Sequence, residues 1–392
     1  MTAVSFPVVG GLTKNAGELS ETYAVVYILG NGSLPVVNGK LAAIAGQEIK
    51  FLGIQRLGDD DTTLTYRIEY GINGAKVRAF GTQELEARGE IDCAVFKRAA
   101  QELIELVESR ASKKISIAEP QVVEALRLLG TDRVSAKASD KSDFFATVQS
   151  GGIQHTHGFS LKSQIAGSST LINASKESTY FEFEVTKDGR VPSQAEIDNL
   201  LQETDRGYDS LIHLMNGGYD FTFFGAADAL TYNLRLVDTC GPEIVASLLL
   251  EELHRRADGE KSPRSLAELV ARLAHRSLAE KHRLFSLFGK TEEEIRQSFA
   301  YKVKGILLAF SAGATPGKRW DGQDTAEGGI IVVKKGGEVV CLQLSTRNAI
   351  GEYLLNSCRF ESPSTTRHHW GTPYFENGRC IVRMQLQVRF TA

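Results

Sequence analysis

Long apolar runs, a basic leader and metal-site cysteine spacing are all missing from this chain. No stretch approaches the ~20 apolar residues that a membrane-spanning helix needs. The opening MTAVSFPVVGG has neither a basic segment nor a long apolar run, so we expect no signal peptide. The five cysteines are scattered without a CxxC pair, which predicts reduced thiols and argues against a disulfide framework or zinc site. We therefore expect a cytoplasmic protein with no membrane partner.

An excess of positive charge is also missing. The formal net charge is −3, from 45 Lys and Arg against 48 Asp and Glu. This balance gives no overall signature of a nucleic-acid binder, although an acidic protein can still carry a local basic cleft. What is present is enough chain for a large core, because 392 residues with 42% hydrophobic content predict two or three domains. Local motifs must therefore carry the functional argument.

Alternation and turn residues predict a β-rich first domain over residues 1–110. Asn73-Gly74 separates two alternating runs, TLTYRIEYG and AKVRAF, and this dipeptide accommodates the positive φ angles of a tight hairpin turn. From Cys93 onward the apolar residues recur at helical spacing, which predicts a helix that closes this domain. Residues 111–241 form a second segment, which carries the motif described below.

The second half of the chain combines a helical segment with returning strands. Residues 242–304 place apolar side chains at helical spacing, and Thr291 with Glu294 has the spacing of a capping box. Residues 305–392 return to short alternating runs, with hairpin turns predicted at Gly336-Gly337 and Asn377-Gly378. The predicted fold class is α/β, with a helical insertion between two strand-rich parts.

The most informative stretch runs from Lys137 to Asn173 and predicts two adjacent strands. Asp143 opens the first strand, and the second carries Ser160 and Lys162, whose side chains face the same way because residues alternate along a strand. A carboxylate can hold Mg²⁺, which prefers oxygen ligands, and a neighbouring ammonium can stabilise charge that develops at phosphorus. Many nucleases use this layout. The pattern by itself is weak and favours a solvated hairpin, since aspartates and lysines are common at strand ends.

The predicted metal ligands are Asp143 and Leu161. Asp140 is the rival acid, but Asp143 is favoured because it opens the apolar run of the strand, whereas Asp140 lies in a lysine-rich turn. His155 and His157 suggest a metal pair, yet no third ligand accompanies them. They are predicted to lie in the solvated turn between the two strands.

Four stretches resemble the HpaII-type family of type II restriction endonucleases, namely KASDKSDF, GFSLKSQIAGSSTLINAS, RFESPSTTRHHWG and MQLQVRF. They lie within residues 120–185 and 300–390. The resemblance implies a PD-(D/E)xK nuclease core in residues 111–241, with a mixed central sheet flanked by helices. It also implies Mg²⁺ as cofactor and sequence-specific double-strand cleavage of duplex DNA at CCGG. The partners would be a second copy of the chain, because a palindromic site favours two-fold symmetry, and a cognate DNA methyltransferase.

One position departs from the wider nuclease pattern. Ser160 stands where a second carboxylate is usual, two residues before Lys162. Some related nucleases recruit a glutamate from beyond the lysine, but the corresponding position is Lys176 here. The catalytic candidates are thus Asp143, Ser160 and Lys162, with the missing acid replaced by Glu124 on a predicted helix, by Glu177, or by Gln164 as a neutral ligand.

The loop from Arg359 to Trp370 is predicted to contact DNA. An arginine fork spans O6 and N7 of guanine, so Arg367 is the candidate for base contact and Arg359 for phosphate contact or loop support. Hydroxyl side chains in the loop can donate to phosphate or base edges. The other predicted DNA contacts are Thr366, His368, Lys141, Ser163 and Asn173.

The helical segment 242–304 is also rich in basic side chains. They form either a DNA-backbone clamp or a solvated helix face that neighbouring glutamates balance. They are His254, Arg255, Arg256, Arg272, His275, Arg276, Lys281, His282 and Arg283.

Two other functions are compatible with the same residues. A nuclease of this fold can act in DNA repair or on branched DNA, without sequence specificity. A DNA-binding protein that has lost catalysis is also compatible, because Ser160 departs from the usual pattern.

Overall fold

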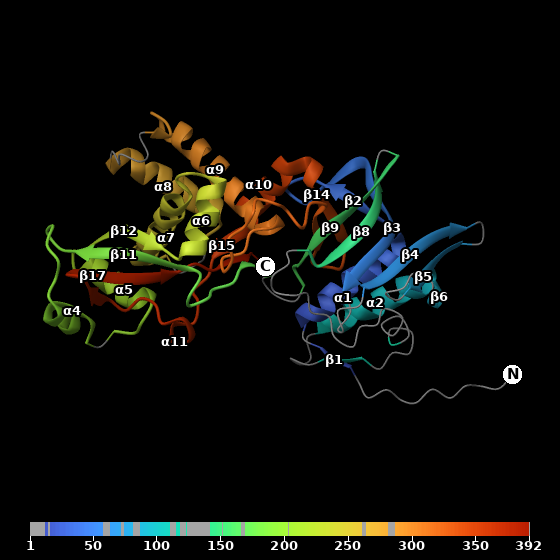
Figure 1. Cartoon of the computed structure of the whole chain (residues 1–392), viewed down its shortest axis with the longest axis horizontal. Coiled ribbons are helices and arrows are strands. Elements are labelled where there is room, and N and C mark those ends of the chain that lie inside the picture. The colour runs from blue at the N-terminus through green and yellow to red at the C-terminus, as the bar shows by residue number, and fades with distance from the viewer. Residues whose placement is uncertain are drawn as a thin grey trace. The chain divides into compact units, whose positions relative to one another are not determined.

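The computed structural model describes most of the chain and divides it into two compact units (Figure 1). The described residues are 12–14, 16–57, 63–71, 74–80, 87–109, 115–117, 123, 142–150, 152–165, 169–202, 204–260, 264–280 and 287–391. Unit 1 takes its residues from 1–169 and 325–350, and unit 2 from 170–324 and 351–391. Each unit is thus assembled from distant parts of the sequence. The sequence predicted four consecutive domains, 1–110, 111–241, 242–304 and 305–392. This division remains a prediction.

A nine-stranded mixed sheet dominates unit 1, in the order β2-β14-β13-β9-β8-β3-β4-β5-β6. Most neighbours are antiparallel, but β9 and β13 run parallel, as do β14 and β2. Because β2 also pairs with β3, the strands β2, β14, β13, β9, β8 and β3 close into a ring. The bounds are β2 Ser33–Val37, β3 Ala43–Leu57, β4 Thr63–Gly71, β5 Gly74–Phe80, β6 Ala87–Asp92, β8 Phe144–Ser150, β9 Ile153–Ser163, β13 Gly329–Val333 and β14 Val339–Gln343; β1 Leu12–Lys14 pairs with β7 Ile115–Ile117.

Two helices, α1 (Ala16–Asn31) and α2 (Cys93–Ser109), share one apolar core with the sheet of unit 1. The core includes Phe51, Phe159 and Ile331 from three different strands. The helix predicted to begin at Cys93 is confirmed. Helix α1 was not predicted, because nearly all of its described side chains are buried and no polar face marks it as a helix.

The predicted hairpin turns are confirmed at two places. Gly336 and Gly337 join β13 to β14, and both have a φ of 85°. Asn377 and Gly378 join β16 to β17, with φ angles of 49° and 74°. Two positive φ angles in succession are what a tight turn between twisted antiparallel strands requires. The strands β4 and β5 are also present and pair antiparallel, while Asn73 lies outside the described residues.

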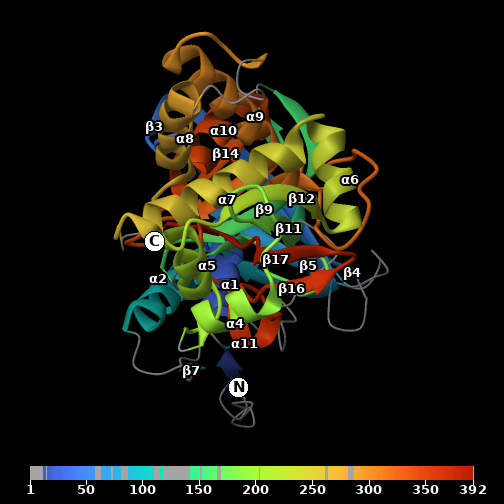
Figure 2. The same cartoon turned by 90° about the vertical axis from the view of Figure 1, so that its left-hand side faces the viewer.

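Unit 2 contains two small sheets and a set of helices (Figure 1, Figure 2). One sheet has the order β12-β11-β17-β16 and the other β10-β18-β15. The strands are β10 Thr170–Ile172, β11 Tyr180–Thr186, β12 Asp220–Ala226, β15 Cys358–Phe360, β16 Tyr374–Glu376, β17 Arg379–Gln385 and β18 Val388–Phe390. The helices are α4 Gln194–Leu201, α5 Tyr208–Asn216, α6 Asp228–Val237, α7 Gly241–Ala257, α8 Leu266–Glu280, α9 Glu292–Ala312 and α11 Thr365–His368. The 3₁₀ turn Leu344–Thr346 belongs to unit 1, and α10 Arg347–Ser357 spans the boundary between the units at residues 350 and 351.

The helical segment is confirmed as α7, α8 and α9. The capping box at the start of α9 is also confirmed, since the Thr291 side chain accepts from the Glu294 amide and Glu294 reaches back to the Thr291 backbone. Each such box satisfies amides that the helix itself leaves without acceptors. Among the described residues, none of the helices combines the length and apolar content needed to cross a bilayer.

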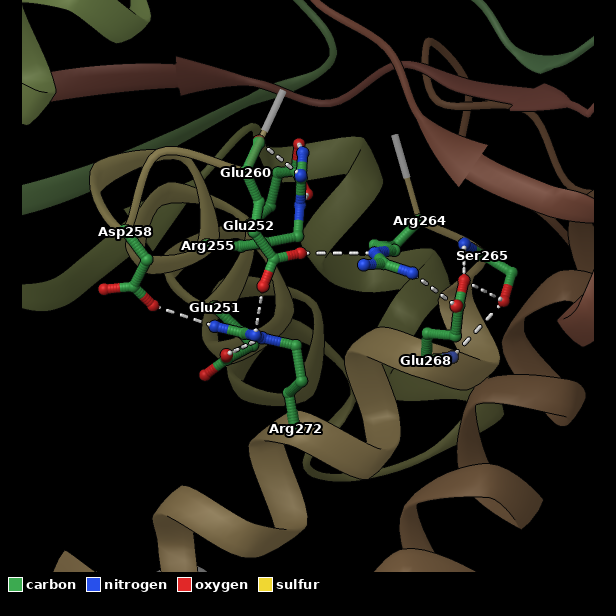
Figure 3. Close-up of polar contacts among 9 residues, drawn as sticks. All are labelled: Glu251, Glu252, Arg255, Asp258, Glu260, Arg264, Ser265, Glu268 and Arg272. Atoms are coloured by element: carbon green, nitrogen blue, oxygen red, sulfur yellow. Dashed lines mark hydrogen bonds and ion pairs between the residues drawn. The ribbon is translucent and has the colours of Figure 1, made fainter. Parts of the chain in front are cut away.

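A network of ion pairs joins α7 to α8 (Figure 3). Glu251 on α7 is only 1% exposed, and it accepts from Arg272 Nε at 2.9 Å and from Arg276 Nε at 2.8 Å. Arg255 is 0% exposed and donates to Glu252 through both Nε and Nη2, at 2.8 and 2.7 Å. The charges are therefore compensated in pairs, and α8 is held to α7 by side chains as well as by apolar contact.

Glu251→Gln is expected to destabilise the protein by about 3 kcal/mol, because it leaves two arginines facing a neutral amide in a largely buried site. Urea unfolding followed by circular dichroism measures the change. Glu293→Gln is the matched control, since Glu293 pairs with Arg296 on the surface with its side chain 57% exposed, and its loss should leave the stability nearly unchanged. Equal losses in the two variants would contradict a structural role for the buried pair.

Candidate functional site

The predicted pair of strands is confirmed, and Asp143 lies directly before the first of them. Strands β8 and β9 pair antiparallel, with Phe144 opposite Phe159. The backbone amide of Asp143 donates to the carbonyl of Phe159 at 2.9 Å. Its carboxylate Oδ2 accepts from the backbone amide of Leu161 at 2.5 Å. The acid is therefore held against β9, at the residue that separates Ser160 from Lys162.

Ser160 and Lys162 lie on the face of β9 that points away from the shared apolar core. Phe159 and Leu161 belong to that core with α1 and α2, so the alternating residues occupy the opposite face. Ser160 is buried and Lys162 is half-buried. The parallel neighbour β13 lies alongside, with Ile330 in register with Ser160. A charged amine next to apolar β13 is less screened than one in open solvent.

Gly158 permits the close approach that fixes the backbone before Asp143. A Cβ atom at this position would lie 2.0 Å from the carbonyl oxygen of Thr325 and 2.3 Å from Ser142 Oγ. Ser142 Oγ in turn donates to the same carbonyl at 2.5 Å. The residue preceding the acid is thus tied to the segment that leads into β13.

The chain continues along β13 after Lys162. The Ser163 amide donates to Ser169 Oγ at 3.1 Å, and the Gln164 amide donates to the carbonyl of Val333 at 2.8 Å. Both side chains are half-buried. Gln164 therefore remains beside the sheet that carries the acid and the lysine.

His155 and His157 were predicted to lie in the turn, and this placement is wrong. Both lie on β9, opposite Val148 and Ala146, because the strand already begins at Ile153. Their rings stack with centroids 5.4 Å apart, and His157 Nδ1 lies 3.2 Å from Glu327. Within the described ranges, no group of three or more His, Cys, Asp or Glu residues is arranged to hold a metal ion.

The predicted site residues are distributed over both units. Glu124, Asp140 and Lys141 lie outside the described residues. Glu177 is exposed in unit 2, where its carboxylate lies 3.8 Å from Lys176 Nζ. Unit 1 brings together Asp143, Ser160, Leu161, Lys162, Ser163 and Gln164, and unit 2 holds Asn173, Arg359, Thr366, Arg367 and His368.

Helix α11 presents part of the predicted DNA-contact loop to solvent. Thr366 and Arg367 are exposed, and Ser364 caps the helix by accepting from the Arg367 amide at 3.3 Å. Partial burial, followed by the positive charges of Arg367 and His369, lowers the pKa of His368 below its ordinary value. Its ring is therefore neutral at pH 7 and offers one donor and one acceptor.

A buried tryptophan anchors this loop. Trp370 Nε1 donates to the carbonyl of Pro363 at 3.2 Å, and its ring meets Tyr208 edge-on with centroids 5.0 Å apart. Aromatic edge-to-face contacts of this kind stabilise beyond the area they bury. The base of the loop is therefore fixed, while Thr366 and Arg367 remain available for contacts.

Arg359 lies on β15 and does not belong to the exposed part of the loop. It is half-buried, and its Nη2 lies 3.4 Å from Glu361 Oε2. Directly opposite it, on β18, is Arg389, which the sequence interpretation passed over. The only signal for Arg389 was its place in the terminal MQLQVRF stretch, because a cross-strand partner becomes visible only with the register.

The basic residues of the helical segment are turned towards carboxylates. Charge balance by glutamates is confirmed for Arg255, Arg272 and Arg276, which contact Glu252 or Glu251. Solvation was wrongly predicted for Arg255, which is fully buried. These three guanidinium groups are engaged within the protein and are poor candidates for a DNA-backbone clamp. Lys281, His282 and Arg283 lie outside the described residues.

Comparison with known proteins gives one consistent result. The profile of the HpaII restriction endonuclease family matches residues 15–390. The chain is 28% identical over 386 residues to the type II restriction enzyme HpaII of Haemophilus parainfluenzae, which covers 96% of this chain and 98% of that protein. No solved structure matches significantly. The similarity therefore extends through both units, well beyond the stretches that first suggested it.

Gly158→Ala is expected to destabilise unit 1 by about 1–3 kcal/mol, because the added methyl group overlaps Thr325 and Ser142. Chemical denaturation measures the loss. Gly225→Ala is the matched control, because Gly225 is also a strand glycine and its Cβ would have nothing nearer than Glu182 Oε2 at 4.0 Å. A Gly158 variant as stable as this control would show that the strand tolerates a side chain there.

Proposed function

This chain belongs to the HpaII restriction endonuclease family and is a type II site-specific deoxyribonuclease, and on that premise we propose that it makes Mg²⁺-dependent double-strand cuts at CCGG. The observation that carries the proposal is the Asp143 carboxylate held on the amide of Leu161, the neighbour of Lys162. An acid and an amine on adjacent strands are the parts that phosphodiester hydrolysis needs. The repair-nuclease and inactive-binder alternatives receive no support from the family match.

A PD-(D/E)xK core in unit 1 is part of this proposal. Its support is the antiparallel pair β8–β9, with the acid at the start of one strand and the lysine on the next. The parallel strand β13 and the helices α1 and α2 complete a mixed sheet with a helical layer. Ser160 occupies the position of the usual second acid and cannot supply its charge.

The candidate ligands in unit 1 are oxygen atoms, which are the donors that Mg²⁺ prefers. Asp143 would hold the ion through its carboxylate and Leu161 through its carbonyl oxygen, both of the hard-oxygen type that Mg²⁺ prefers. The bound ion would lower the pKa of a water and offset charge on the phosphate. Lys162 would supply the ammonium group that stabilises the charge developing at the phosphate. Of the three replacements for the second acid, Gln164 is the one on the described part of unit 1, with Glu177 in unit 2 and Glu124 outside the described residues.

Unit 2 supplies contacts to DNA in this proposal. Arg367 reads guanine from the exposed face of α11, with Thr366 and His368 beside it. Ser163 in unit 1 and Asn173 in unit 2 touch the backbone, as does Lys141. The enzyme acts in the cytoplasm as a homodimer, because the target is a palindrome, and a cognate DNA methyltransferase protects the host sites.

Asp143→Asn is expected to abolish cleavage and to leave DNA binding measurable, since the amide keeps the shape but not the charge that holds Mg²⁺. Lys162→Ala is expected to slow cleavage by roughly 10²–10³-fold. Digestion of plasmid DNA with Mg²⁺, and with a chelator in its place, measures both. Asp220→Asn, at an exposed end of β12, is the control and should cut normally. Full activity in Asp143→Asn refutes the assignment.

Arg367→Ala is expected to reduce discrimination between CCGG and a duplex with one altered base pair by ~1–3 kcal/mol, roughly tenfold or more in relative cleavage rate. Competition between the two duplexes in one reaction measures the ratio. Arg190→Ala is the control, because that exposed guanidinium is already paired with Glu196 at 2.5 Å. An unchanged ratio in Arg367→Ala shows that another residue reads the base.

A further inference from the structure

Two arginines lie directly opposite each other on adjacent strands of the small sheet β10-β18-β15 in unit 2. Arg359 on β15 is the direct cross-strand partner of Arg389 on β18. Their neighbours Cys358, Phe360 and Val388 are buried, so alternation places both guanidinium groups on the other face of the sheet. Side chains directly opposite each other start about 5 Å apart, and like charges in such a pair repel. The arrangement therefore needs a compensating anion.

The described residues supply that compensation only in part. Glu361 lies 3.4 Å from Nη2 of Arg359, longer than the ~2.7–2.9 Å of a close charge-assisted hydrogen bond. In the described part of the chain, Arg389 has no carboxylate within ion-pair distance. The Nε atoms of both arginines are buried and lack an acceptor among the residues that the structure describes. This contrasts with Arg255, whose Nε and Nη groups all meet oxygen atoms.

Buried donors without acceptors are rare in folded proteins, because each one gives up its hydrogen bonds to water without replacement. We propose that Arg359 and Arg389 together bind one phosphate group of the DNA backbone. The phosphate supplies the missing negative charge, and its oxygens accept from both guanidinium forks. The inference rests on the proposed function, and it adds Arg389 to the DNA-contacting residues.

The surroundings favour a phosphate over a base edge. The Arg359 side chain is only 22% exposed and starts from a strand, so it does not reach outward as the α11 residues do. The other neighbour of Arg389 is Thr170 on β10, whose hydroxyl can donate to the same phosphate. Such a contact positions the duplex without reading its sequence.

Arg389→Met, Arg359→Met and the double variant test the pair, because methionine keeps an apolar stem and removes the charge. Binding of a CCGG duplex and of a duplex without the site is measured by fluorescence anisotropy in EDTA over a series of salt concentrations. Each single variant should bind both duplexes roughly tenfold to hundredfold more weakly. The slope of log affinity against log salt should become about 1 unit shallower in the double variant, as expected for one phosphate. Arg190→Met removes a paired exposed arginine and should change neither quantity.

Stability in urea without DNA separates binding from a structural role. Arg389→Met should be as stable as the wild type or more stable, because it relieves a like-charge pair. Inorganic phosphate serves as a second probe. It should raise the melting temperature of the wild type more than that of Arg389→Met, whereas a phosphate effect without any change in DNA affinity overturns the backbone assignment.

Four further outcomes would overturn the phosphate site, and one of them would also overturn the proposed function. Unchanged DNA affinity and salt slope in Arg389→Met, with the wild type cutting normally, overturns the phosphate site and leaves the proposed function standing. A loss confined to the CCGG duplex, or a loss of folding stability in both Arg389→Met and Arg389→Lys, also overturns it. A wild type that binds neither duplex and cuts no plasmid overturns both proposals.

Discussion

The hydrogen bond from the Leu161 amide to the Asp143 carboxylate is the contact on which the candidate active site depends. It joins the residue before β8 to the end of β9, so the acid is held on the strand that carries Lys162. The position is reinforced by Gly158 and by the bond from Ser142 to Thr325, which hold the backbone just before the acid. Because each of these two hydrogen bonds has a backbone group of a strand or of the segment before it as one partner, a change in the sheet register would separate the acid from the lysine.

Arginine serves two different purposes in unit 2. In the α7–α8 network, Arg255 and Arg272 meet carboxylates at short distances, and the charges cancel inside the protein. On the small sheet, Glu361 lies at 3.4 Å from Arg359 alone, and the buried Nε atoms of Arg359 and Arg389 lack acceptors among the residues that the structure describes. Under the proposed phosphate site, this division lets a chain of net charge −3 present positive charge to DNA. Most of its basic residues need not face the duplex, provided that a few uncompensated ones do.

Local features were predictable from the sequence, and features set by distant pairing were not. The hairpin at Asn377-Gly378, the helix from Cys93 and the strand pair around the motif follow from turn residues and periodicity, and all are present. Helix α1 escaped prediction because it is buried on nearly every side, and the opposition of Arg389 to Arg359 depends on a register that no local pattern encodes. The histidines on β9 were misplaced because the turn is shorter than expected, an error of a few residues at an element boundary.

The parallel pairing of β9 with β13 has a consequence for synthesis on the ribosome. Strand β9 ends at Ser163 and its neighbour β13 begins at Gly329, with the whole of residues 170–324 placed in the other unit. During translation, β9 therefore has no β13 to pair with until most of the remaining polypeptide has been synthesised. Long-range strand pairing of this kind folds slowly. A truncated or stalled chain that ends before Gly329 consequently carries Asp143 and Lys162 without β13 beside them.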